Sequence, residues 1–166
     1  DWRVREDAVE ALAQIVEKGN ETAIKAVTAR LEERVAYVRQ AAINALAQIV
    51  EKGDEAAIKA VAARLEDGDW CVRDAAINAL AQIVNKGDEK VIKAVAARLE
   101  HGVAYVRLIA INALAQIVNK GDEKVITAVT ALLKDVNSSV RKAAINALSQ
   151  IVEKGNKAEI EAVTAQ

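Results

Sequence analysis

The chain has 166 residues, and 52% of them are hydrophobic, yet it contains only two Trp, two Tyr and no Phe. It has no Pro and no Met, and its 23 basic and 24 acidic residues leave a net charge of −1. The core must therefore consist of Ala, Leu, Ile and Val, in a composition that favours helices over β-rich or disordered classes. Near-neutral charge removes the electrostatic reason to expect nucleic acid or an anionic membrane as a partner.

One pattern repeats along the whole chain without insertion or deletion. The pair Val-Arg recurs at a constant interval, and a Gly and a Leu keep the same spacing. We expect one domain over 1–166, with five repeats at 1–34, 35–68, 69–102, 103–136 and, shorter, 137–166. Such self-similarity is typical of a stacked array whose units bury apolar faces against their neighbours. The Val-Arg pairs are Val4-Arg5, Val38-Arg39, Val72-Arg73, Val106-Arg107 and Val140-Arg141.

Each repeat is predicted to form two helices. In the third repeat, the first helix covers 72–84, because its apolar residues recur at helical spacing. Gly87 suits a left-handed residue that closes this helix, and Asp88 suits the N-cap of the next. The second helix then runs through Ile92, Val95 and Leu99.

The start of the first helix differs between the repeats. Asp1 and Asp69 are suitable N-caps, whereas Val35 and Val103 occupy the same column without a capping side chain. The first four repeats therefore alternate with a period of two repeats. Duplication of a two-repeat module explains this alternation slightly better than selection for a ligand does.

The repeat resembles a known family at the turn from one repeat into the next. Asp67 is followed six residues later by Arg73, inside the pattern Asp-x-x-x-x-Val-Arg-x-x-Ala-Ala. This pattern is similar to the HEAT-like repeats of phycobilin-lyase-type proteins and of artificial alphaRep proteins, and residues 147–156 resemble the third helix of armadillo repeats. The resemblance implies an all-α, right-handed solenoid of two-helix repeats. It also implies a ladder of Asp67 with Arg73 and Asp135 with Arg141, in which Glu33 and His101 replace the Asp.

Comparison of the five copies places most of their variation on one stripe of the first helix. All four aromatic residues lie in its two most variable columns, and further columns hold Asn and Gln. The alphaRep resemblance implies that these columns line a concave surface that contacts targets, and in armadillo repeats the position of the Gln column holds a peptide-binding Asn. The residues expected to bind a partner are Tyr37, Gln40, Asn44, Trp70, Cys71, Asp74, Asn78, Tyr105, Leu108, Ile109, Asn112 and Lys142.

Leu108 and Ile109 support this interpretation most directly, because other copies have charged residues, Gln or Ala at these positions. Exposed apolar residues flanked by Tyr and Trp are typical of a protein-binding hot spot. The alternative is that Leu108 and Ile109 fill the core and that the aromatic residues cap the end of a helix.

No motif predicts an enzyme. Cys71 and His101 are the only Cys and His, and a nucleophilic pair would need contact between them and a third group. No cluster has the spacing of metal ligands, and no glycine-rich phosphate loop is present. We therefore expect no catalytic residues, no metal and no cofactor.

The sequence is compatible with three functions. The first is a non-enzymatic scaffold, natural or engineered, that binds a protein or peptide. The second is a structural array that self-associates through uncapped end repeats, giving a homo-oligomer. The third, a lyase or chaperone-like role, rests on the phycobilin-lyase resemblance alone. We expect neither nucleic-acid nor membrane binding, and a cytoplasmic location. The absence of Met and the short fifth repeat suggest a piece excised from a longer protein, or an engineered one.

Overall fold

The computed structural model describes residues 1–152, and all regular secondary structure in this part of the chain is helical. Each described repeat begins with a long helix, and each of the first four continues with a shorter α-helix, as the repeat pattern predicts. A short 3-10 turn, which the pattern did not predict, follows each of these second helices. The second helix expected in the fifth repeat lies outside the described residues. The elements are α1 (Trp2–Ile15), α2 (Glu21–Thr28), η1 (Ala29–Glu32), α3 (Ala36–Ile49), α4 (Glu55–Ala62), η2 (Ala63–Glu66), α5 (Trp70–Ile83), α6 (Glu89–Ala96), η3 (Ala97–Glu100), α7 (Ala104–Ile117), α8 (Glu123–Ala131), η4 (Leu132–Lys134) and α9 (Ser138–Ile151).

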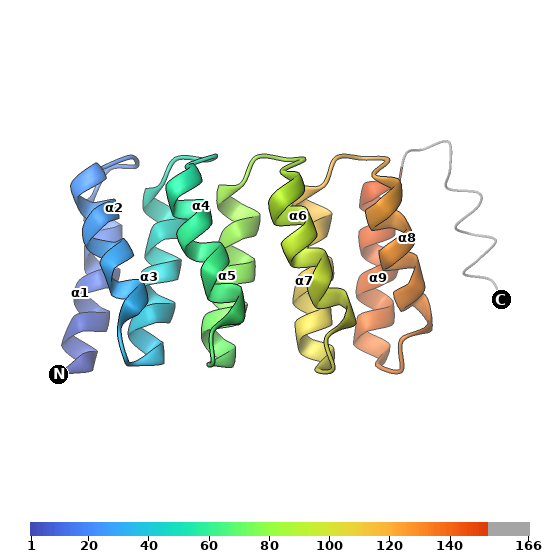
Figure 1. Cartoon of the computed structure of the whole chain (residues 1–166), viewed down its shortest axis with the longest axis horizontal. Helices are drawn as coiled ribbons and strands as arrows, with labels where there is room; N and C mark the ends of the chain where they lie inside the picture. The colour runs from blue at the N-terminus through green and yellow to red at the C-terminus, as the bar shows by residue number, and fades with distance from the viewer. Residues whose placement is uncertain (153–166) are drawn as a thin grey trace. The chain divides into compact units, whose positions relative to one another are not determined.

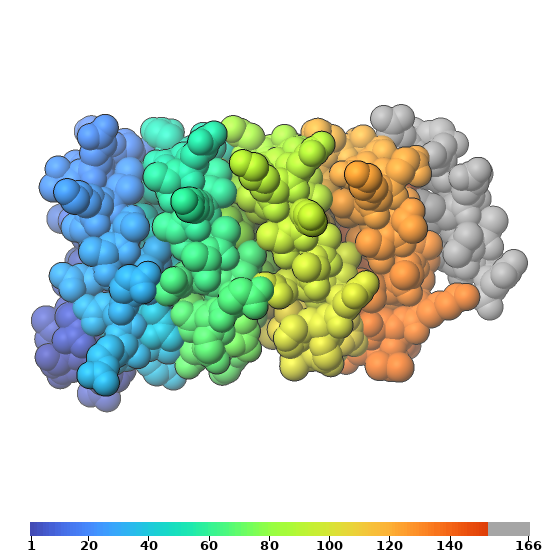
Figure 2. Space-filling model, viewed as in Figure 1, coloured from blue at the N-terminus to red at the C-terminus, as the bar shows by residue number. Residues whose placement is uncertain are grey.

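The chain divides into two compact units, and the division falls inside the third repeat, between Asn85 and Lys86. In the first unit, α1, α3 and α5 pack side by side, and α2 and α4 lie in front of them (Figure 1). In the second unit, α7 packs beside α9, and α6 and α8 lie in front. In each unit, the second helices lie on the side that faces the viewer in Figure 2. Each unit is therefore a two-layered stack in which every second helix packs on the first helix of the next repeat.

The core consists of the apolar columns that recur at helical spacing. Ile43, Leu46 and Ile49 of α3 are almost completely buried, and the equivalent residues of α5 and α7 are buried in the same way. The alanine column represented by Ala42 is also fully buried, which lets neighbouring first helices approach closely. Leu99 is buried as expected, but it lies in the 3-10 turn η3 because α6 ends at Ala96.

The capping residues follow the sequence pattern. Asp69 accepts a hydrogen bond from the backbone N–H of Cys71 at the start of α5, and Asp88 accepts one from Val91 at the start of α6. Val35 and Val103 make no side-chain cap. Gly87 has a φ of +84°, as expected for a left-handed residue, but α5 already ends at Ile83. The glycine therefore shapes the turn before α6 and does not close α5.

This turn also connects neighbouring repeats through the main chain. The N–H of Gly19 donates to the carbonyl of Ile49, the last residue of the next first helix, at 2.7 Å. The same bond recurs from Gly53 to Ile83, from Gly87 to Ile117 and from Gly121 to Ile151, at 2.7 to 2.8 Å. Each bond satisfies a carbonyl at a helix C-terminus, which the helix itself leaves without a partner.

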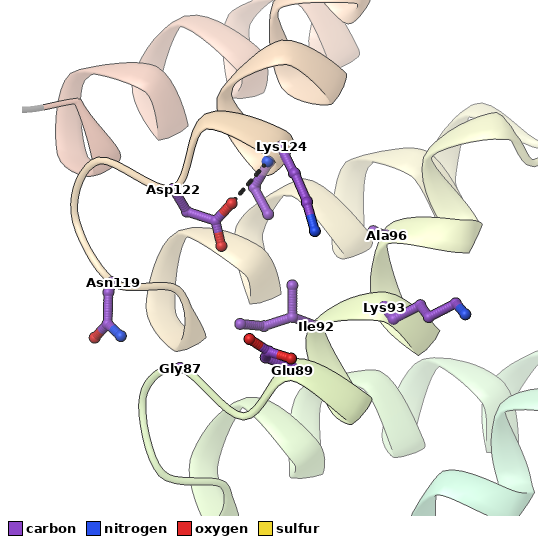
Figure 3. A pocket seen from close by; sticks show the side chains of 9 residues that line it. Gly87, Glu89, Ile92, Lys93, Ala96, Asn119, Asp122 and Lys124 are labelled. Carbon is purple, nitrogen blue, oxygen red and sulfur yellow. Dashed lines mark hydrogen bonds between the residues drawn. The ribbon is translucent and has the colours of Figure 1, made fainter.

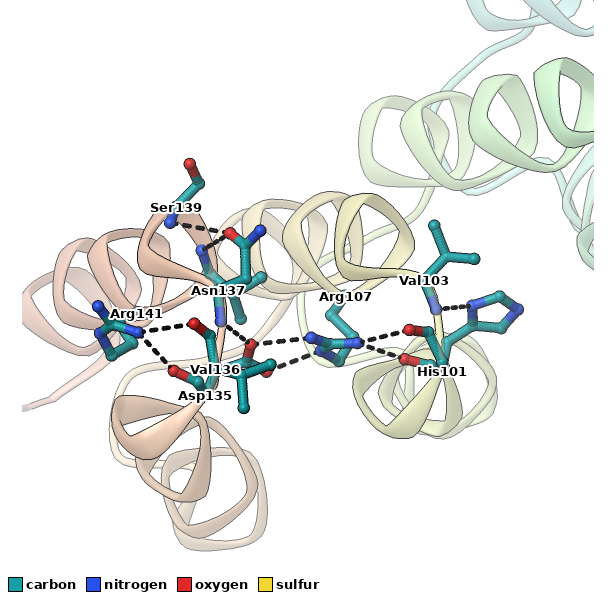
Figure 4. Close-up of polar contacts among 10 residues, drawn as sticks. His101, Val103, Arg107, Asp135, Val136, Asn137, Ser139 and Arg141 are labelled. Atoms are coloured by element: carbon teal, nitrogen blue, oxygen red, sulfur yellow. Dashed lines mark hydrogen bonds and ion pairs between the residues drawn. The ribbon is translucent and has the colours of Figure 1, made fainter.

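The Asp–Arg ladder is present, but its register differs from the one that the resemblance implied. Asp67 forms a bidentate ion pair with Arg39 of the preceding Val-Arg pair: Nε and Nη2 of Arg39 donate to the two carboxylate oxygens at 2.9 and 2.8 Å. Arg73, in contrast, donates only to the backbone carbonyl of Asp67. Asp135 pairs with Arg107 in the same way, and Arg141 donates to its backbone carbonyl (Figure 4). The predicted pairing with the arginine six residues later was therefore wrong.

His101 takes over part of the role of the missing aspartate. Its ring Nδ1 accepts a hydrogen bond from the Val103 N–H, just as Asp135 accepts one from Asn137 (Figure 4). Arg107 donates to the His101 carbonyl at 2.7 Å. The imidazole thus stabilises the turn, as a carboxylate does, but without a carboxylate's charge.

Candidate protein-binding face

The Asn and Gln columns of the first helices are exposed in every described repeat. We call them the Asn/Gln stripe: Glu10, Gln14, Asn44, Gln48, Asn78 and Gln82 in the first unit, and Asn112, Gln116, Asn146 and Gln150 in the second. The side chain of Gln82 donates to the backbone carbonyl of Asn78 at 3.2 Å, and the side chain of Gln116 donates to the backbone carbonyl of Asn112 at 3.3 Å. The amide groups of the other Asn and Gln side chains in the stripe can donate to and accept from a ligand.

Aromatic side chains lie at the beginning of these helices in the first unit. Tyr37 is exposed and stacks on Trp2, with their ring centroids 5.7 Å apart. Arg3 lies over the other ring of this pair, 5.2 Å from the Trp2 centroid. Trp70 at the start of α5 is also exposed. These rings offer apolar contact area beside a polar stripe, a combination found in protein-binding surfaces.

Two of the residues expected on this face in the first unit are buried. Cys71 and Asp74 are 7% and 8% exposed. Burial, together with a hydrogen bond to Asp69, raises the pKa of the Cys71 thiol to about 11. Burial also raises the pKa of Asp74, while the charge of Arg73 opposes that shift. Cys71 is therefore a protonated, buried thiol at neutral pH and not the exposed contact residue that the sequence predicted.

In the second unit, Tyr105, Asn112 and Lys142 are exposed and Leu108 is half-buried. Ile109 is only 6% exposed, and the alanines of its column, Ala41, Ala75 and Ala143, are also buried. Ile109 therefore belongs to the core, which was the alternative left open for it. In the first unit, Gln40 is half-buried and Asn44 and Asn78 are exposed.

A small polar cavity lies on the Asn/Gln stripe between α1 and α3. Its volume is about 160 Å³, and four of its lining side chains, Glu10, Gln14, Asn44 and Gln48, are exposed and polar. Alanines, among them the buried Ala41 and Ala45, form the rest of its lining. None of the four polar side chains forms a hydrogen bond or ion pair with another residue between 1 and 152.

A larger cavity, of about 530 Å³, lies in the second unit between α6 and α8. Ile92 and Lys124 extend into the space between the two helices, and Asp122 is held by its N-cap bond to Val125 (Figure 3). Glu89 and Lys93 also line it. The cavity carries carboxylates and ammonium groups in equal number, so it has no charge preference.

Nothing in the described part of the chain forms a metal centre or a membrane span. Residues 1–152 contain no group of three or more His, Cys, Asp and Glu side chains that could hold a metal ion. None of their helices is both long and apolar enough to cross a bilayer.

A profile of HEAT repeats matches residues 36–115 and 93–166, which together make up more than half of the chain. The chain belongs to the HEAT repeat family. This membership agrees with the stacked two-helix units and with the Asp–Arg ladder between them. No curated protein matches the sequence of this HEAT repeat protein.

Its fold is similar to that of several designed repeat proteins. A designed armadillo repeat protein in complex with the peptide (KR)4 shares 23% identity, with a TM-score of 0.68 over 91% of this chain and 77% of that one. Computationally designed armadillo repeat proteins for modular peptide recognition share 24% identity, with a TM-score of 0.65 over 99% and 84%. An engineered protein shares 26% identity, with a TM-score of 0.64 over 99% and 82%. The first two likenesses establish the fold alone.

Not all the residues that line the polar cavity could be predicted from the repeat columns. Glu10, Gln14 and Gln48 were visible in their columns, but only Asn44 was assigned to the binding face. The signal that could have found Glu10 is its charge, because the four other copies have Asn at this position. The cavity itself depends on how α1 and α3 pack, which no single column reveals.

Proposed function

We propose that this HEAT repeat protein is a non-enzymatic scaffold that binds a peptide or protein segment along the Asn/Gln stripe and the neighbouring aromatic side chains. One observation carries the proposal: the stripe is exposed in every described repeat, and most of its amide groups have no partner within the described part of the chain. Amide side chains can pair with the N–H and C=O groups of an extended peptide, which repeat at regular intervals.

The structural neighbours support a peptide as the class of ligand. One of them was determined with a bound peptide, and others were designed for modular peptide recognition. The sites on this chain that we propose for contact are Tyr37, Gln40, Asn44, Trp70 and Asn78 in the first unit. In the second unit they are Tyr105, Leu108, Asn112 and Lys142. Cys71, Asp74 and Ile109 are left out because they are buried.

Selection from a random-peptide display library tests this function. We expect the chain to enrich specific peptides, and Tyr37→Ala with Asn44→Ala to weaken their binding by at least tenfold, since hot-spot truncations cost about 2 kcal/mol or more. Lys25→Ala with Lys59→Ala, two exposed residues of the second helices, serves as the control. Enrichment that is unaffected by the first pair of substitutions would rule out this face.

A second candidate is self-association through the N-terminal end, and the apolar surface of α1 favours it. Val4 and Ile15 are 64% and 79% exposed, whereas their counterparts Val38 and Ile49 are 0% and 1% exposed. The stripe of α3 is covered by α1 of the preceding repeat. A second copy of the chain carries the same kind of covering helix, and a head-to-tail contact of this kind produces open assemblies.

Light scattering across a range of concentrations distinguishes this candidate. We expect the mean mass to rise with concentration and to fall to that of a monomer in Val4→Lys/Ile15→Lys. A mass that stays monomeric in the unaltered chain at the highest concentration contradicts self-association and leaves the peptide-binding proposal intact.

A further inference from the structure

The polar cavity between α1 and α3 has features that the other described cavities do not combine. It is small, its exposed lining is polar, and it carries one carboxylate, that of Glu10, with three amides and no basic side chain. At about 160 Å³ it is well below the roughly 300 Å³ of typical small-molecule sites, so it fits one side chain better than a cofactor.

The carboxylate gives this cavity a preference for positive charge. Glu10 has no ion-pair partner among residues 1–152, because Arg5 lies beside Glu33 and Arg3 lies over the Trp2 ring. Glu6 precedes Glu10 by one helical turn, so the two like charges repel each other slightly in the free protein. A bound cation would relieve this repulsion.

The amides make one cation more suitable than another. An ammonium group is a compact point charge, whereas a guanidinium is planar and presents five N–H donors. Two of these donors can pair with the Glu10 carboxylate, and the others can reach the side-chain oxygens of Gln14, Asn44 and Gln48. The lining therefore matches the donors of a guanidinium better than those of an ammonium group.

We propose that the polar cavity between α1 and α3 binds an arginine side chain of the peptide or protein ligand, with Glu10 as its charge partner. This inference rests on the proposed function, because the arginine belongs to a chain bound along the Asn/Gln stripe. Glu10 then determines which ligand residue is accepted at this repeat, where the other copies have Asn.

The chain itself provides the test variant and its control. Glu10→Asn gives α1 the residue that the four other repeats have in this column, so the helix should keep its stability. Glu17→Asn removes the same charge from the turn after α1, where Asn85 and Asn119 occupy the equivalent positions. Fluorescence anisotropy with labelled octa-arginine, octa-lysine and octa-serine peptides measures binding to each variant.

We expect the unaltered chain to bind octa-arginine more tightly than octa-lysine, and octa-serine least. Glu10→Asn should weaken octa-arginine binding roughly tenfold, the loss expected for one charge-assisted interaction, while Glu17→Asn should change it less than twofold. Equal losses in both variants, or no loss in Glu10→Asn, would overturn the assignment of the arginine to this cavity. Absence of octa-arginine binding to the unaltered chain would overturn it as well.

Asn44→Ala separates this inference from the proposed function. If octa-arginine binding depends on Asn44 and Tyr37 but not on Glu10, the Asn/Gln stripe still binds peptides and only the arginine subsite is wrong. If binding is unaffected by all three residues, both proposals fail.

Discussion

The contribution of a single aspartate to stability depends on which side chains and backbone groups surround it. Burial tends to raise the pKa of Asp67, but its hydrogen bonds with Arg39 and with the Asp69 N–H outweigh burial and leave the pKa below its ordinary value of 3.8. Asp74 has no such hydrogen bond to offset burial, and burial raises its pKa. Asp67, which precedes α5, and Asp74, which lies within it, therefore contribute to stability with opposite signs.

Asp67→Asn should lower the free energy of unfolding by roughly 1–3 kcal/mol at pH 7, because it removes a part-buried, charge-assisted pair. A group whose pKa is lowered in the folded state stabilises the protein above its unfolded pKa and loses that contribution as the pH falls. The difference between the variant and the unaltered chain should therefore shrink below about pH 4, the ordinary range of an aspartate. Urea unfolding at pH 7 and pH 3 measures it, and a difference that stays constant would contradict the role of this ion pair.

Asp74→Asn should act in the opposite direction. Because the pKa of Asp74 is raised on folding, its ionised form costs stability at neutral pH, and that cost disappears as the pH falls and the group binds a proton. The variant should thus be more stable than the unaltered chain at pH 7 and about equal to it at pH 3. The same urea series tests this, and destabilisation at pH 7 would show that the carboxylate has a favourable role.

Glycine substitutions test the turn before each second helix. Gly53 has a φ of +89°, and an added Cβ would lie 2.5 Å from Nδ2 of Asn85, whereas at Gly19 the nearest atom, in Glu51, is 3.6 Å away. Both alanine variants bear the cost of the left-handed backbone, about 1 kcal/mol, and Gly53→Ala has a clash in addition. Thermal unfolding should therefore show the larger loss for Gly53→Ala, and equal losses would mean that Asn85 moves away freely.

The elements themselves could be predicted from the sequence to a large extent. The constant repeat period, the apolar spacing and residues such as Asp69 and Asp88 predicted the helices and their caps. The periodicity could not predict that Asp67 pairs with Arg39 and not with Arg73, because both arginines occupy the same column of the repeat. Nor could it predict that Ile109 is buried while Leu108 is half-buried, since that depends on side-chain packing around α7. The polar cavity forms only where α1 and α3 pack together, so no single column of the repeat predicts it.

The missing caps can be restored one helix at a time. Val35→Asp and Val103→Asp give α3 and α7 the residue that caps α1 and α5, so each should raise the free energy of unfolding by about 1 kcal/mol. The reverse change, Asp69→Val, should lower it by a similar amount. Chemical denaturation checks all three variants, and a Val-to-Asp change without a gain would mean that the valines contribute packing that offsets the lost cap.

At the scale of the whole molecule, the position of a repeat in the array determines how much an equivalent residue contributes to the free energy of unfolding. Ile15 and Ile49 occupy equivalent positions, but Ile15 is 79% exposed and Ile49 is 1% exposed. Ile49→Ala should cost about 2–5 kcal/mol as a cavity-forming change, whereas Ile15→Ala should cost less than about 1 kcal/mol. Urea unfolding of the two variants at low protein concentration avoids any contribution from self-association. Similar losses of stability in Ile15→Ala and Ile49→Ala would mean that α1 is covered in solution.

The backbone hydrogen bond from each turn glycine to the last residue of the next first helix affects how the number of repeats can change in evolution. Both partners are main-chain groups, so the joint between repeats does not depend on which side chains surround it, provided that the glycine stays. A duplication or deletion of one whole repeat, in register, recreates the same joint wherever it occurs. Arrays of this type can therefore gain or lose repeats and diversify their exposed columns while the connection between neighbours is inherited unchanged.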